Sequence, residues 1–558
     1  MFDFVVDVLG RSAPGRVPSS SRRYVLPLLA VVGLLIAGCS TAADAPTGPD
    51  TADRLTIATQ EDRGPINLFA GVAEPLAELV YDKLVAPSPY VDEPKPWLAT
   101  TVRAIDPSTW EVDLRQDITW HDGTPFGVED VVFTFQYMKD APTGRWTHHV
   151  SDIPTISSTT AVDVDTVRFT CAFACPELGT VTLADLPIIP KHIWSAVPPA
   201  EAKKVTTLPI GTGPYRLMSY DATSGYRFEA NPAYFGGTPR VRELVVPVIE
   251  DPSATFTALR SGQIDATFRP LSPELIDQFA GTDGIQVIKT GAYRFPEMRM
   301  NFERAPFDNP DFRRAVSRAV DKDQMLAVVG LGKGRAAVEG YPHPDSPHTA
   351  MGLSTPYDAT EANTLLDGLG LRDTDGDGVR EGPAGPLNYQ ILVNGAFPTD
   401  VRAAELVAED LGEVGIGATV AGVDAGTLSD RNAKREFDLQ VGTITAHGVA
   451  DPDQFIMSHR SGYLWKAPAI AYPEWDALFE RWKATTTNEA REEVSHEMQM
   501  LFNRQPTSVP LYYPDEYYAV RPGSLTGWME SPGFGVVHKW SLLPAQVSRD
   551  ANAVVAAR

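Results

Sequence analysis

The sequence is poor in cysteine and in positive charge. Only three of its 558 residues are cysteine, and 48 lysines and arginines stand against 72 aspartates and glutamates, which gives a formal net charge of −24. Nucleic acids and anionic membrane surfaces repel a body of this charge, so both are excluded as partners of the folded chain. The G-x-S-x-G and H-E-x-x-H motifs of common hydrolases are also absent.

Long apolar runs are lacking too, with one exception near the N-terminus. Arg22 and Arg23 precede the 15-residue run YVLPLLAVVGLLIAG, which stops just before Cys39. A membrane-spanning helix needs roughly 20 residues, whereas the core of a signal peptide is shorter and follows basic residues. The polar stretch STAADAPTGPDTAD comes next, which argues against a buried core helix. The ending LIAGC resembles a bacterial lipobox, and this resemblance implies that Cys39 is lipidated and begins the mature protein.

The two other cysteines, Cys171 and Cys175, lie close together in FTCAFACPEL. Because exported proteins meet oxidising conditions, we expect this pair to form a small disulfide loop. A metal site is an alternative, although no further cysteine and no neighbouring histidine is available. A pair of reduced, packed thiols is the other alternative.

The stretch WHDGTPFGVEDVVFTFQYM places His121, Asp122, Glu129 and Asp130 within ten residues of one another. They resemble an acid–base cluster, but each has a structural explanation. The pattern predicts a helix that begins near Val128, so both later acids fall in its first turn, where unpaired backbone N–H groups and the helix dipole favour anions. His121 and Asp122 come directly before Gly123, and an Asp-Gly pair is typical of a turn. We therefore interpret the cluster as part of the scaffold and not as a catalytic site.

What the chain does contain is the pattern of a large α/β protein. Hydrophobic residues make up 43% and charged residues 22%, as in ordinary globular proteins, and the length allows two or three lobes. Short apolar strands alternate with amphipathic helices. Strands are predicted in RLTIATQ, RELVVPVI, IGATVAGV and SVPLYYP; helices are predicted in LAELVYDKLV, DPSATFTALRSG, DNPDFRRAVSRAVDKDQMLAVV and AAELVAEDLGEVG, and two more between residues 473 and 505.

Seven segments, in this order, resemble the extracellular solute-binding proteins of family 5, the peptide- and nickel-type binding proteins of ABC importers. The resemblance covers residues 54–543, nearly the whole mature chain. It implies a two-lobed α/β fold like that of type II periplasmic binding proteins, with an extra inserted domain (class C). The segments are WHDGTPFGVEDVVFTF, IIPKHIW, GTGPYRL, NPAYFGG, ALRSGQIDA, MNFERAPFDNPDFRRAVSRAVDK and VPLYYP.

The resemblance also implies a division of the chain. After the signal peptide with its lipobox cysteine and a flexible tether, lobe I comes in three pieces, interrupted by an inserted small domain and by lobe II. The expected boundaries are 1–39 for the signal peptide and lipobox, 40–53 for the tether, 54–87, 205–294 and 515–558 for lobe I with the C-terminal tail, 88–204 for the small domain, and 295–514 for lobe II.

The resemblance places the ligand near the segment TITAHGVADPDQF. In peptide-binding members, an aspartate four residues before the proline of a Glu/Asp-Pro pair holds the α-amino group of the peptide. Here the pair is Asp451-Pro452, and the corresponding position is Gly448, which cannot neutralise an ammonium group. Asp451 or Asp453 could take its place only in a loop of different shape. This departure leaves room for sugars, blocked peptides or metal chelates.

Other candidate contacts come from the same resemblance or from side-chain chemistry. Gly71 and Val72, in LFAGVAEP, match a turn whose backbone pairs with an extended peptide; the alternative is an ordinary loop. Aromatic rings offer apolar platforms in clefts. The remaining candidates are Tyr293 and Trp465, for which core packing is the alternative, and His447 and Arg460, for which a surface position is the alternative.

The acidic run LRDTDGDGVRE follows the start of a calcium-loop pattern. Asp373, Asp375, Asp377 and Gly378 stand at positions 1, 3, 5 and 6, but position 12 is Ala384 where a glutamate is expected. The alternative is an Asp/Gly-rich turn between a helix and a strand, and no metal is assigned.

Taken together, the residues and the resemblance predict a lipid-anchored receptor outside the cytoplasmic membrane, periplasmic or on the cell surface. It captures a peptide or another small polar solute by hinge closure, acts as a monomer without a cofactor, and delivers its ligand to an ABC permease and ATPase without chemistry on it. The membrane is contacted only through the lipid. The alternatives are an oligosaccharide- or metal-chelate-binding member of the family, a secreted hydrolase with paired carboxylates, and a surface protein that signals or adheres.

Overall fold

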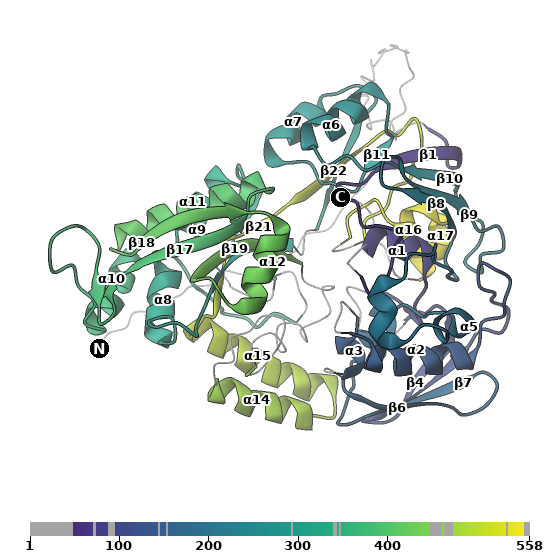
Figure 1. Ribbon diagram of the computed structural model, residues 1–558, viewed down its shortest axis with the longest axis horizontal. Helices are drawn as coiled ribbons and strands as arrows, with labels where there is room; N and C mark the ends of the chain where they lie inside the picture. The colour runs from purple at the N-terminus through teal and green to yellow at the C-terminus, as the bar shows by residue number, and fades with distance from the viewer. Residues whose placement is uncertain are drawn as a thin grey trace, which may run out of the picture. The chain divides into compact units, whose positions relative to one another are not determined.

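Three larger sheets organise the chain (Figure 1). The computed structural model describes residues 48–70, 74–87, 95–142, 146–151, 154–291, 294–338, 343–344, 348–445, 460–461, 472–531 and 534–551.

The first sheet has seven strands and combines both ends of the chain. Its order is β12-β22-β11-β1-β10-β9-β8, with β1 parallel to both β10 and β11 and the other pairs antiparallel. The C-terminal strand β22 therefore lies between two strands, β12 and β11, that come much earlier in the sequence. The bounds are β1 Ala52–Ala58, β8 Tyr215–Asp221, β9 Gly225–Ala230, β10 Val241–Val246, β11 Ala266–Thr267, β12 Gln286–Thr290 and β22 Glu516–Val520.

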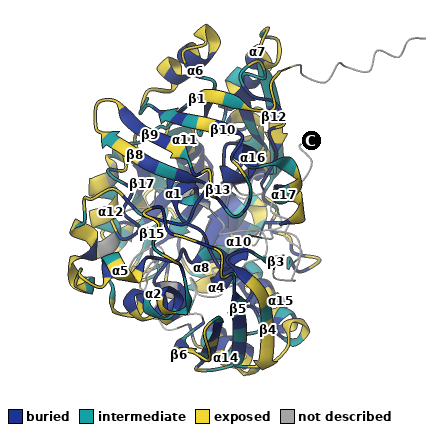
Figure 2. Ribbon diagram, turned by 90° about the vertical axis from the view of Figure 1, so that its right-hand side faces the viewer, coloured by how far each residue is buried: buried dark blue, intermediate teal, exposed yellow. Residues whose placement is uncertain are grey.

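The second sheet has four antiparallel strands in the order β4-β5-β7-β6. Its inner strand β5 alternates buried and half-buried residues, whereas β4 is mostly exposed, a contrast visible in Figure 2. Helix α2 covers one face and begins at Val128, as the sequence predicts. The bounds are β4 Ala99–Asp106, β5 Thr109–Leu114, β6 Ile156–Ala161, β7 Thr166–Cys171, α2 Val128–Asp140, α3 His148–Ser151, α4 Thr182–Asp185 and α5 Lys191–Trp194.

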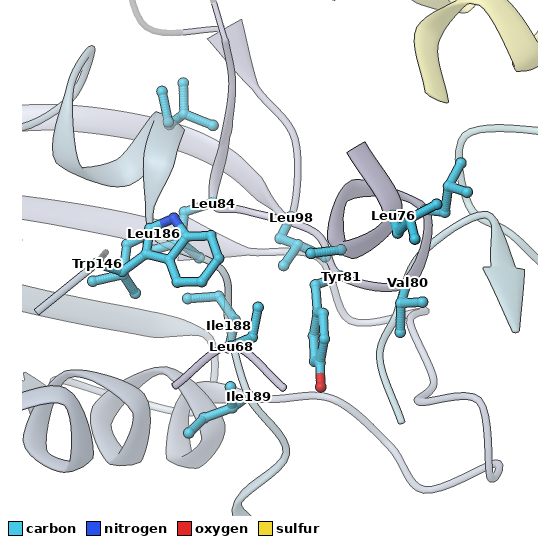
Figure 3. Packing of buried hydrophobic residues seen from close by; sticks show 14 of the residues in the cluster. Leu68, Leu76, Val80, Tyr81, Leu84, Leu98, Trp146, Leu186, Ile188 and Ile189 are labelled. Atoms are coloured by element: carbon cyan, nitrogen blue, oxygen red, sulfur yellow. The ribbon is translucent and has the colours of Figure 1, made fainter. Parts of the chain in front are cut away.

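These first two sheets share one hydrophobic core. Figure 3 shows where they meet: Leu76 and Val80 of α1 (Glu74–Val80), together with the following Tyr81, lie close to Leu98 and Ile188 from the segment that carries the four-stranded sheet. All five side chains are nearly inaccessible to solvent. Burial of this continuous apolar surface holds the two sheets together as one body.

The third sheet has five strands in the order β18-β17-β19-β13-β20 and its own core. Alternate residues of β13 point to opposite faces: Met298 and Met300 pack with α8 and α11, whereas Phe295 packs with the α14–α15 hairpin. The bounds are β13 Arg294–Met300, β17 Asn388–Asn394, β18 Gly417–Val423, β19 Leu439–Thr445, β20 Ser508–Pro510, α8 Pro310–Ala319, α9 Lys322–Val328, α10 Ala359–Gly368, α11 Pro398–Glu413, α12 Ala425–Lys434, α14 Pro473–Ala484 and α15 Asn488–Arg504.

The remaining elements are short. Helices α6 and α7 pack at the β11–β12 end of the seven-stranded sheet, and α16 and α17 follow β22 near the C-terminus (Figure 1). Their bounds are α6 Pro252–Ser261, α7 Ile276–Ala280, α16 Lys539–Leu542, α17 Ala545–Asp550, the 3₁₀ turns Pro199–Lys204 and Pro273–Leu275, and the two-stranded pairs β2 Val85–Ala86 with β3 Lys95–Pro96, β14 Gly334–Ala336 with β21 Tyr512–Pro514, and β15 Glu381–Gly382 with β16 Gly385–Pro386.

One predicted helix is two helices in the structure. The sequence pattern suggested a single helix across DNPDFRRAVSRAVDKDQMLAVV, but α8 ends at Ala319 and α9 starts at Lys322. Val320 is extended, and the Asp321 side chain accepts a hydrogen bond from the N–H of Gln324, so it caps a new helix. Aspartate competes for backbone N–H groups in this way, which is why it favours helix starts over helix interiors.

A buried charge network ties the C-terminal α16 to the segment after α1. Asp82 is fully buried and accepts hydrogen bonds from Trp97 Nε1 (2.9 Å), Tyr234 Oη (2.9 Å), Thr212 Oγ1 (3.1 Å) and Lys539 Nζ (3.0 Å). Four donors, of which Lys539 is 457 positions away in the sequence, converge on this one carboxylate. Its charge is therefore compensated where water does not reach.

The same network continues through Glu78 to the four-stranded sheet. Glu78 lies 2.5 Å from Lys83 Nζ and 3.4 Å from Lys539 Nζ, and Lys83 also reaches Asp185, which is 2.7 Å from His149 Nε2. Burial opposes ionisation of Glu78, but the two lysines outweigh burial and hold the pKa of Glu78 below its ordinary value.

Candidate functional site

The described chain passes between the seven-stranded and the five-stranded sheet at two places. Every strand of the first sheet lies before Gly291 or after Asp515, and every strand of the five-stranded sheet lies between these residues. Thr290 and Glu516, at the ends of β12 and β22, are paired in register, so the two crossings lie side by side. Two adjacent short crossings between two separately packed cores form the geometry of a hinge.

Charged groups bind the two crossings to each other. Arg294, the first residue of β13, donates to Glu516 from Nε (2.9 Å) and lies 2.6 Å from it through Nη2, while Tyr518 Oη donates to the other carboxylate oxygen at 3.1 Å. Glu516 raises the pKa of Arg294 above its ordinary value against the opposing effect of burial. Beside this pair, Lys289 Nζ lies 2.8 Å from Asp515. Sequence reasoning missed this hinge pair, because its partners are 222 residues apart.

Most of the candidate contact residues lie outside the described part of the chain. This applies to Gly71, Val72, Tyr293, His447, Gly448, Asp451, Asp453 and Trp465. The described residues beside two of these segments are Arg294 and Thr445, which are paired in the antiparallel β13–β19 ladder. The chain therefore enters β13 and leaves β19 at the same strand end, next to the first crossing.

Arg460 and Ser461 are described and lie against helix α14. The Arg460 guanidinium is 5.3 Å from the centre of the Phe479 ring. Asp476 accepts hydrogen bonds from the Ser461 N–H (3.0 Å) and Oγ (2.5 Å), and the Tyr472 N–H donates to Ser461 Oγ at 2.8 Å. Asp476, in the first turn of α14, thus positions this part of the chain. The sequence contains a signal for this role of Asp476: the helix start PEWD is rich in acids, and acids in the first turn of a helix often bind nearby N–H groups.

His121 joins two of the motifs that the sequence analysis singled out, WHDG and GTGPY. Its Nε2 donates to the carbonyl of Gly213 (2.9 Å) and its Nδ1 accepts from the N–H of Gly211 (3.3 Å), so the imidazole is neutral. Desolvation lowers the pKa of His121 to about 4. The two glycines are required by close contact with the end of α1: a Cβ on Gly211 would lie 1.8 Å from the carbonyl oxygen of Val80.

The three acids of the same stretch also serve local structure. Asp130 accepts from the Gly127 N–H (3.1 Å) and from the Lys191 N–H (2.9 Å). Asp122 is 2.7 Å from His192 Nε2, and Glu129 is 2.7 Å from the amino group of Lys191. The Gly127–Asp130 bond closes the start of α2, and the other contacts connect α2 and the turn before it to the start of α5, which agrees with the interpretation of this cluster as scaffold.

The acidic loop gathers four carboxylates. Asp373, Asp375, Asp377 and Glu381 have oxygens within 4.8 Å of one another, and all except the half-buried Glu381 are exposed. Backbone N–H groups already bind them: Asp373 accepts from Gly376 at 2.7 Å, and Glu381 accepts from the N–H of Thr374 at 2.7 Å. Glu381 was not recognised in the sequence, because the calcium-loop count places the expected glutamate at Ala384. The arrangement matches an Asp/Gly-rich turn closed by its own backbone.

Cys171 and Cys175 form a disulfide, and it lies at the end of β7. Among the residues that the structure describes, no helix combines the length and the apolar character needed to cross a bilayer.

Comparison with known proteins gives a consistent family. Residues 93–466 match the model of the bacterial extracellular solute-binding proteins, family 5 (middle region). The chain is 26% identical to protein XP55 of Streptomyces lividans over 432 residues, which are 76% of this chain and 77% of that protein. It is also 26% identical to di/tripeptide-binding protein 2 of Pseudomonas aeruginosa over 554 residues, 92% of this chain and 97% of the relative.

Solved structures share the fold. The oligopeptide-binding protein AppA of Bacillus subtilis, in complex with a nonapeptide, superimposes with a TM-score of 0.74 at 21% identity, over 85% of this chain and 95% of AppA. NikZ of Campylobacter jejuni, in complex with Ni(L-His), gives 0.75 at 20% identity, over 85% and 94%. The mannohexaose-bound oligopeptide-binding protein of Thermotoga maritima gives 0.73 at 21% identity, over 91% and 99%. The fold is therefore that of the two-lobed α/β binding proteins.

Proposed function

Because the chain belongs to the bacterial extracellular solute-binding proteins of family 5, we propose that it is the receptor of an ABC importer that captures a peptide or a related polar solute. The family match over residues 93–466 carries this proposal. The arrangement of two separately packed cores joined through two adjacent crossings supports it, because a binding protein of this kind needs a hinge.

The proposed mechanism is closure of two lobes around the solute. We assign the seven-stranded and four-stranded sheets to one lobe, since they share a core, and the five-stranded sheet with α14 and α15 to the other. This assignment follows the expected division at residues 54–87, 88–204, 205–294, 295–514 and 515–558. The ligand stabilises the closed form by the difference in its affinity for the two forms, and it leaves unchanged when the permease opens the lobes.

Peptides are the solute class that we favour. Di/tripeptide-binding protein 2 is similar along nearly its whole length, and AppA holds a nonapeptide in the same fold. The segment with Gly448, Asp451 and Asp453 is the proposed place for the charged or polar end of the ligand, with Asp451 or Asp453 in place of the amine-binding aspartate. Metal chelates and oligosaccharides are the second candidates, because NikZ and the Thermotoga protein hold such ligands in this fold.

We further propose that Cys39 carries the lipid that anchors the receptor outside the cytoplasmic membrane. The basic pair, the 15-residue apolar run and the ending LIAGC support this proposal. Metabolic labelling with a radioactive fatty acid tests it: the wild-type protein incorporates label and the Cys39→Ala variant does not. Equal labelling of both proteins would exclude Cys39 as the lipidation site.

Native mass spectrometry of residues 40–558, purified gently from the original host, tests the proposed function. A bound mass that corresponds to peptides supports peptides as the solute class, and the mass of a single sugar or metal chelate assigns the ligand to one of the second candidate classes. A protein that carries no solute, binds none from peptide, sugar and nickel-chelate panels, and hydrolyses a substrate instead would refute the receptor function.

The proposed ligand segment has its own test. Asp451→Asn and Asp453→Asn are made separately, and their affinities for the solute identified by mass spectrometry are measured by calorimetry. Loss of an ionic contact to a ligand cation is expected to weaken binding at least about tenfold in one of the two variants. Unchanged affinity in both variants would remove this segment from the site.

A further inference from the structure

A contact between the disulfide loop and the α14–α15 hairpin joins the two separately packed cores. The loop of residues 171–175 follows β7 of the four-stranded sheet, and the hairpin packs on Phe295 of the five-stranded sheet. In Figure 1 the α14–α15 hairpin lies beside the part of the chain that carries α3 and β6, at the lower edge of the view. None of the residues in the contact belongs to the two crossings at residues 291 and 515, so it forms a further connection between the lobes.

Arg491 of α15 is the centre of this contact. Its side chain is buried, forms an ion pair with Glu177, and donates from Nη2 to the carbonyl of Ala174 at 2.6 Å. On its own side, the guanidinium lies 3.8 Å from the centre of the Trp482 ring and its Nε donates to Thr485 Oγ1 at 3.2 Å. The hairpin therefore positions the guanidinium, and both strong acceptors for it come from the other lobe.

The carboxylate of Glu177 depends on this arginine. Glu177 is 8% exposed, and its Oε1 has no hydrogen-bond partner among the described residues. Burial raises the pKa of Glu177 above its ordinary value, and Arg491 opposes that effect. When the two lobes separate, Glu177 and Arg491 lose each other as partners but regain contact with water. The ion pair therefore stabilises the joined state only while its geometry is good enough to offset this loss of hydration.

The disulfide maintains that geometry. Cys171 and Cys175 are buried, the Cys175 N–H donates to the carbonyl of Pro107 (2.9 Å), and Trp110 Nε1 donates to the carbonyl of Cys175 (3.0 Å). At the other end of the loop, the Cys171 N–H donates to the carbonyl of Ser108 (2.8 Å), so both ends are fixed on the β4–β5 hairpin. Phe173, inside the loop, packs against the cluster of the α14–α15 hairpin.

We propose that residues 171–177, closed by the Cys171–Cys175 disulfide, form a clasp that docks on Arg491 and holds the two lobes together. The clasp slows the release of a captured solute, because the lobes can open at the hinge only after the clasp is broken. This consequence rests on the proposed receptor function. The clasp gives the disulfide a role in lobe closure in addition to the stability of its own domain.

Three variants of residues 40–558 test the clasp. Glu177→Gln removes the charge while it keeps the side-chain volume, Arg491→Gln removes the guanidinium, and Cys171→Ser combined with Cys175→Ser frees the loop. Arg481→Gln is the matched control, since Arg481 forms an exposed ion pair with Glu497 within the same helical hairpin, at 2.7 Å. Circular dichroism establishes that each variant folds; if Arg491→Gln does not, Glu177→Gln and the serine double variant decide.

Small-angle X-ray scattering without solute measures the clasp by itself. The clasp variants are expected to have a larger radius of gyration than the wild-type and Arg481→Gln proteins. Curves of Glu177→Gln and of the serine double variant that superimpose on the wild-type curve would refute the clasp. This measurement needs no ligand, so it stands even if the receptor function fails.

Stopped-flow release of trialanine and of a mixed nonapeptide measures the consequence. Clasp variants are expected to release a bound probe about tenfold faster or more, with Arg481→Gln unchanged, because loss of a buried charge partner acts mainly on dissociation. Wild-type binding with equal release rates in all proteins would refute the clasp and leave the receptor function intact. If neither peptide binds to the wild-type protein, the peptide function fails and the scattering result decides on the clasp.

Discussion

Replacement of Lys539 by methionine tests the buried network most directly. The Lys539 amino group lies 3.0 Å from Asp82 and 3.4 Å from Glu78, and its side chain is 2% exposed. Methionine has a similar length and fills the same space without a charge. After the change, the fully buried Asp82 carboxylate keeps three neutral donors but no cation in contact.

The expected loss follows from the cost of a buried charge without its partner. Breaking a buried ion pair from one side typically costs about 3–5 kcal/mol. The three neutral donors still solvate Asp82, and Lys83 still pairs with Glu78 at 2.5 Å, so the lower end applies, about 3 kcal/mol of unfolding free energy. Adding Asp82→Asn removes the uncompensated charge, so the double variant is expected to recover at least about 1.5 kcal/mol relative to the sum of the two single effects.

Urea unfolding, followed by tryptophan fluorescence and circular dichroism, measures these free energies. Lys191→Met is the matched control: Lys191 pairs with Glu129 at 2.7 Å on the surface, and its loss is expected to cost less than about 1 kcal/mol. The reasoning would be refuted if Lys539→Met lost no more unfolding free energy than the control. It would also be refuted if the loss of the double variant equalled the sum of the two single losses, because Asp82 would then not depend on Lys539 for compensation of its charge.

Three further predictions concern packing and pH. Gly211→Ala is expected to destabilise the fold by about 3 kcal/mol or to prevent folding, because the new Cβ would collide with the backbone at the end of α1. Thermal unfolding measures this loss, and Gly127→Ala is the control, because the space around a Cβ at Gly127 is open. Desolvation lowers the pKa values of His121 and His538 to about 4. Since the unfolded chain takes up these protons near pH 6.5, urea stability is expected to fall as the pH drops from about 6.5 to 4, and a flat profile would contradict this. Burial raises the pKa of Asp410 to about 7. Because the unfolded chain ionises this carboxyl near pH 4, the folded state loses stability as the pH rises from about 4 to 7. Asp410→Asn is therefore expected to be more stable than the wild-type protein at pH 8, with no gain at pH 4.

Local sequence patterns predicted the elements well. The strands at residues 52–58, 241–246 and 417–423, the start of α2 at Val128 and the two C-terminal helices all follow from apolar periodicity and from capping or turn residues. The break between α8 and α9 was missed although Asp321 signals it, because the apolar stripe continues across the break. Periodicity reports which face is buried, and it is insensitive to a change of helix axis.

The resemblance to the family gave the fold, and the comparisons confirm it. Neither pattern nor resemblance could give the long-range polar contacts. The Arg294–Glu516, Lys539–Asp82 and Arg491–Glu177 pairs join residues between 222 and 457 positions apart, and each charged partner alone resembles an ordinary surface charge. The predicted ligand contacts stay predictions, since all but Arg460 lie outside the described residues.

The place of β22 in the seven-stranded sheet sets the order in which the chain can fold. This strand, Glu516–Val520, pairs with β12 on one side and with β11 on the other, both of which are made about 230 residues or more earlier. The five-stranded sheet needs nothing beyond residue 510. During synthesis, the lobe encoded in the middle of the sequence is therefore complete first, and the lobe that contains the N-terminal strand waits with an open sheet edge until almost the last residues emerge. A sheet edge exposed for that time invites wrong pairing, so a truncation after residue 514 is expected to leave one folded lobe and one prone to aggregation.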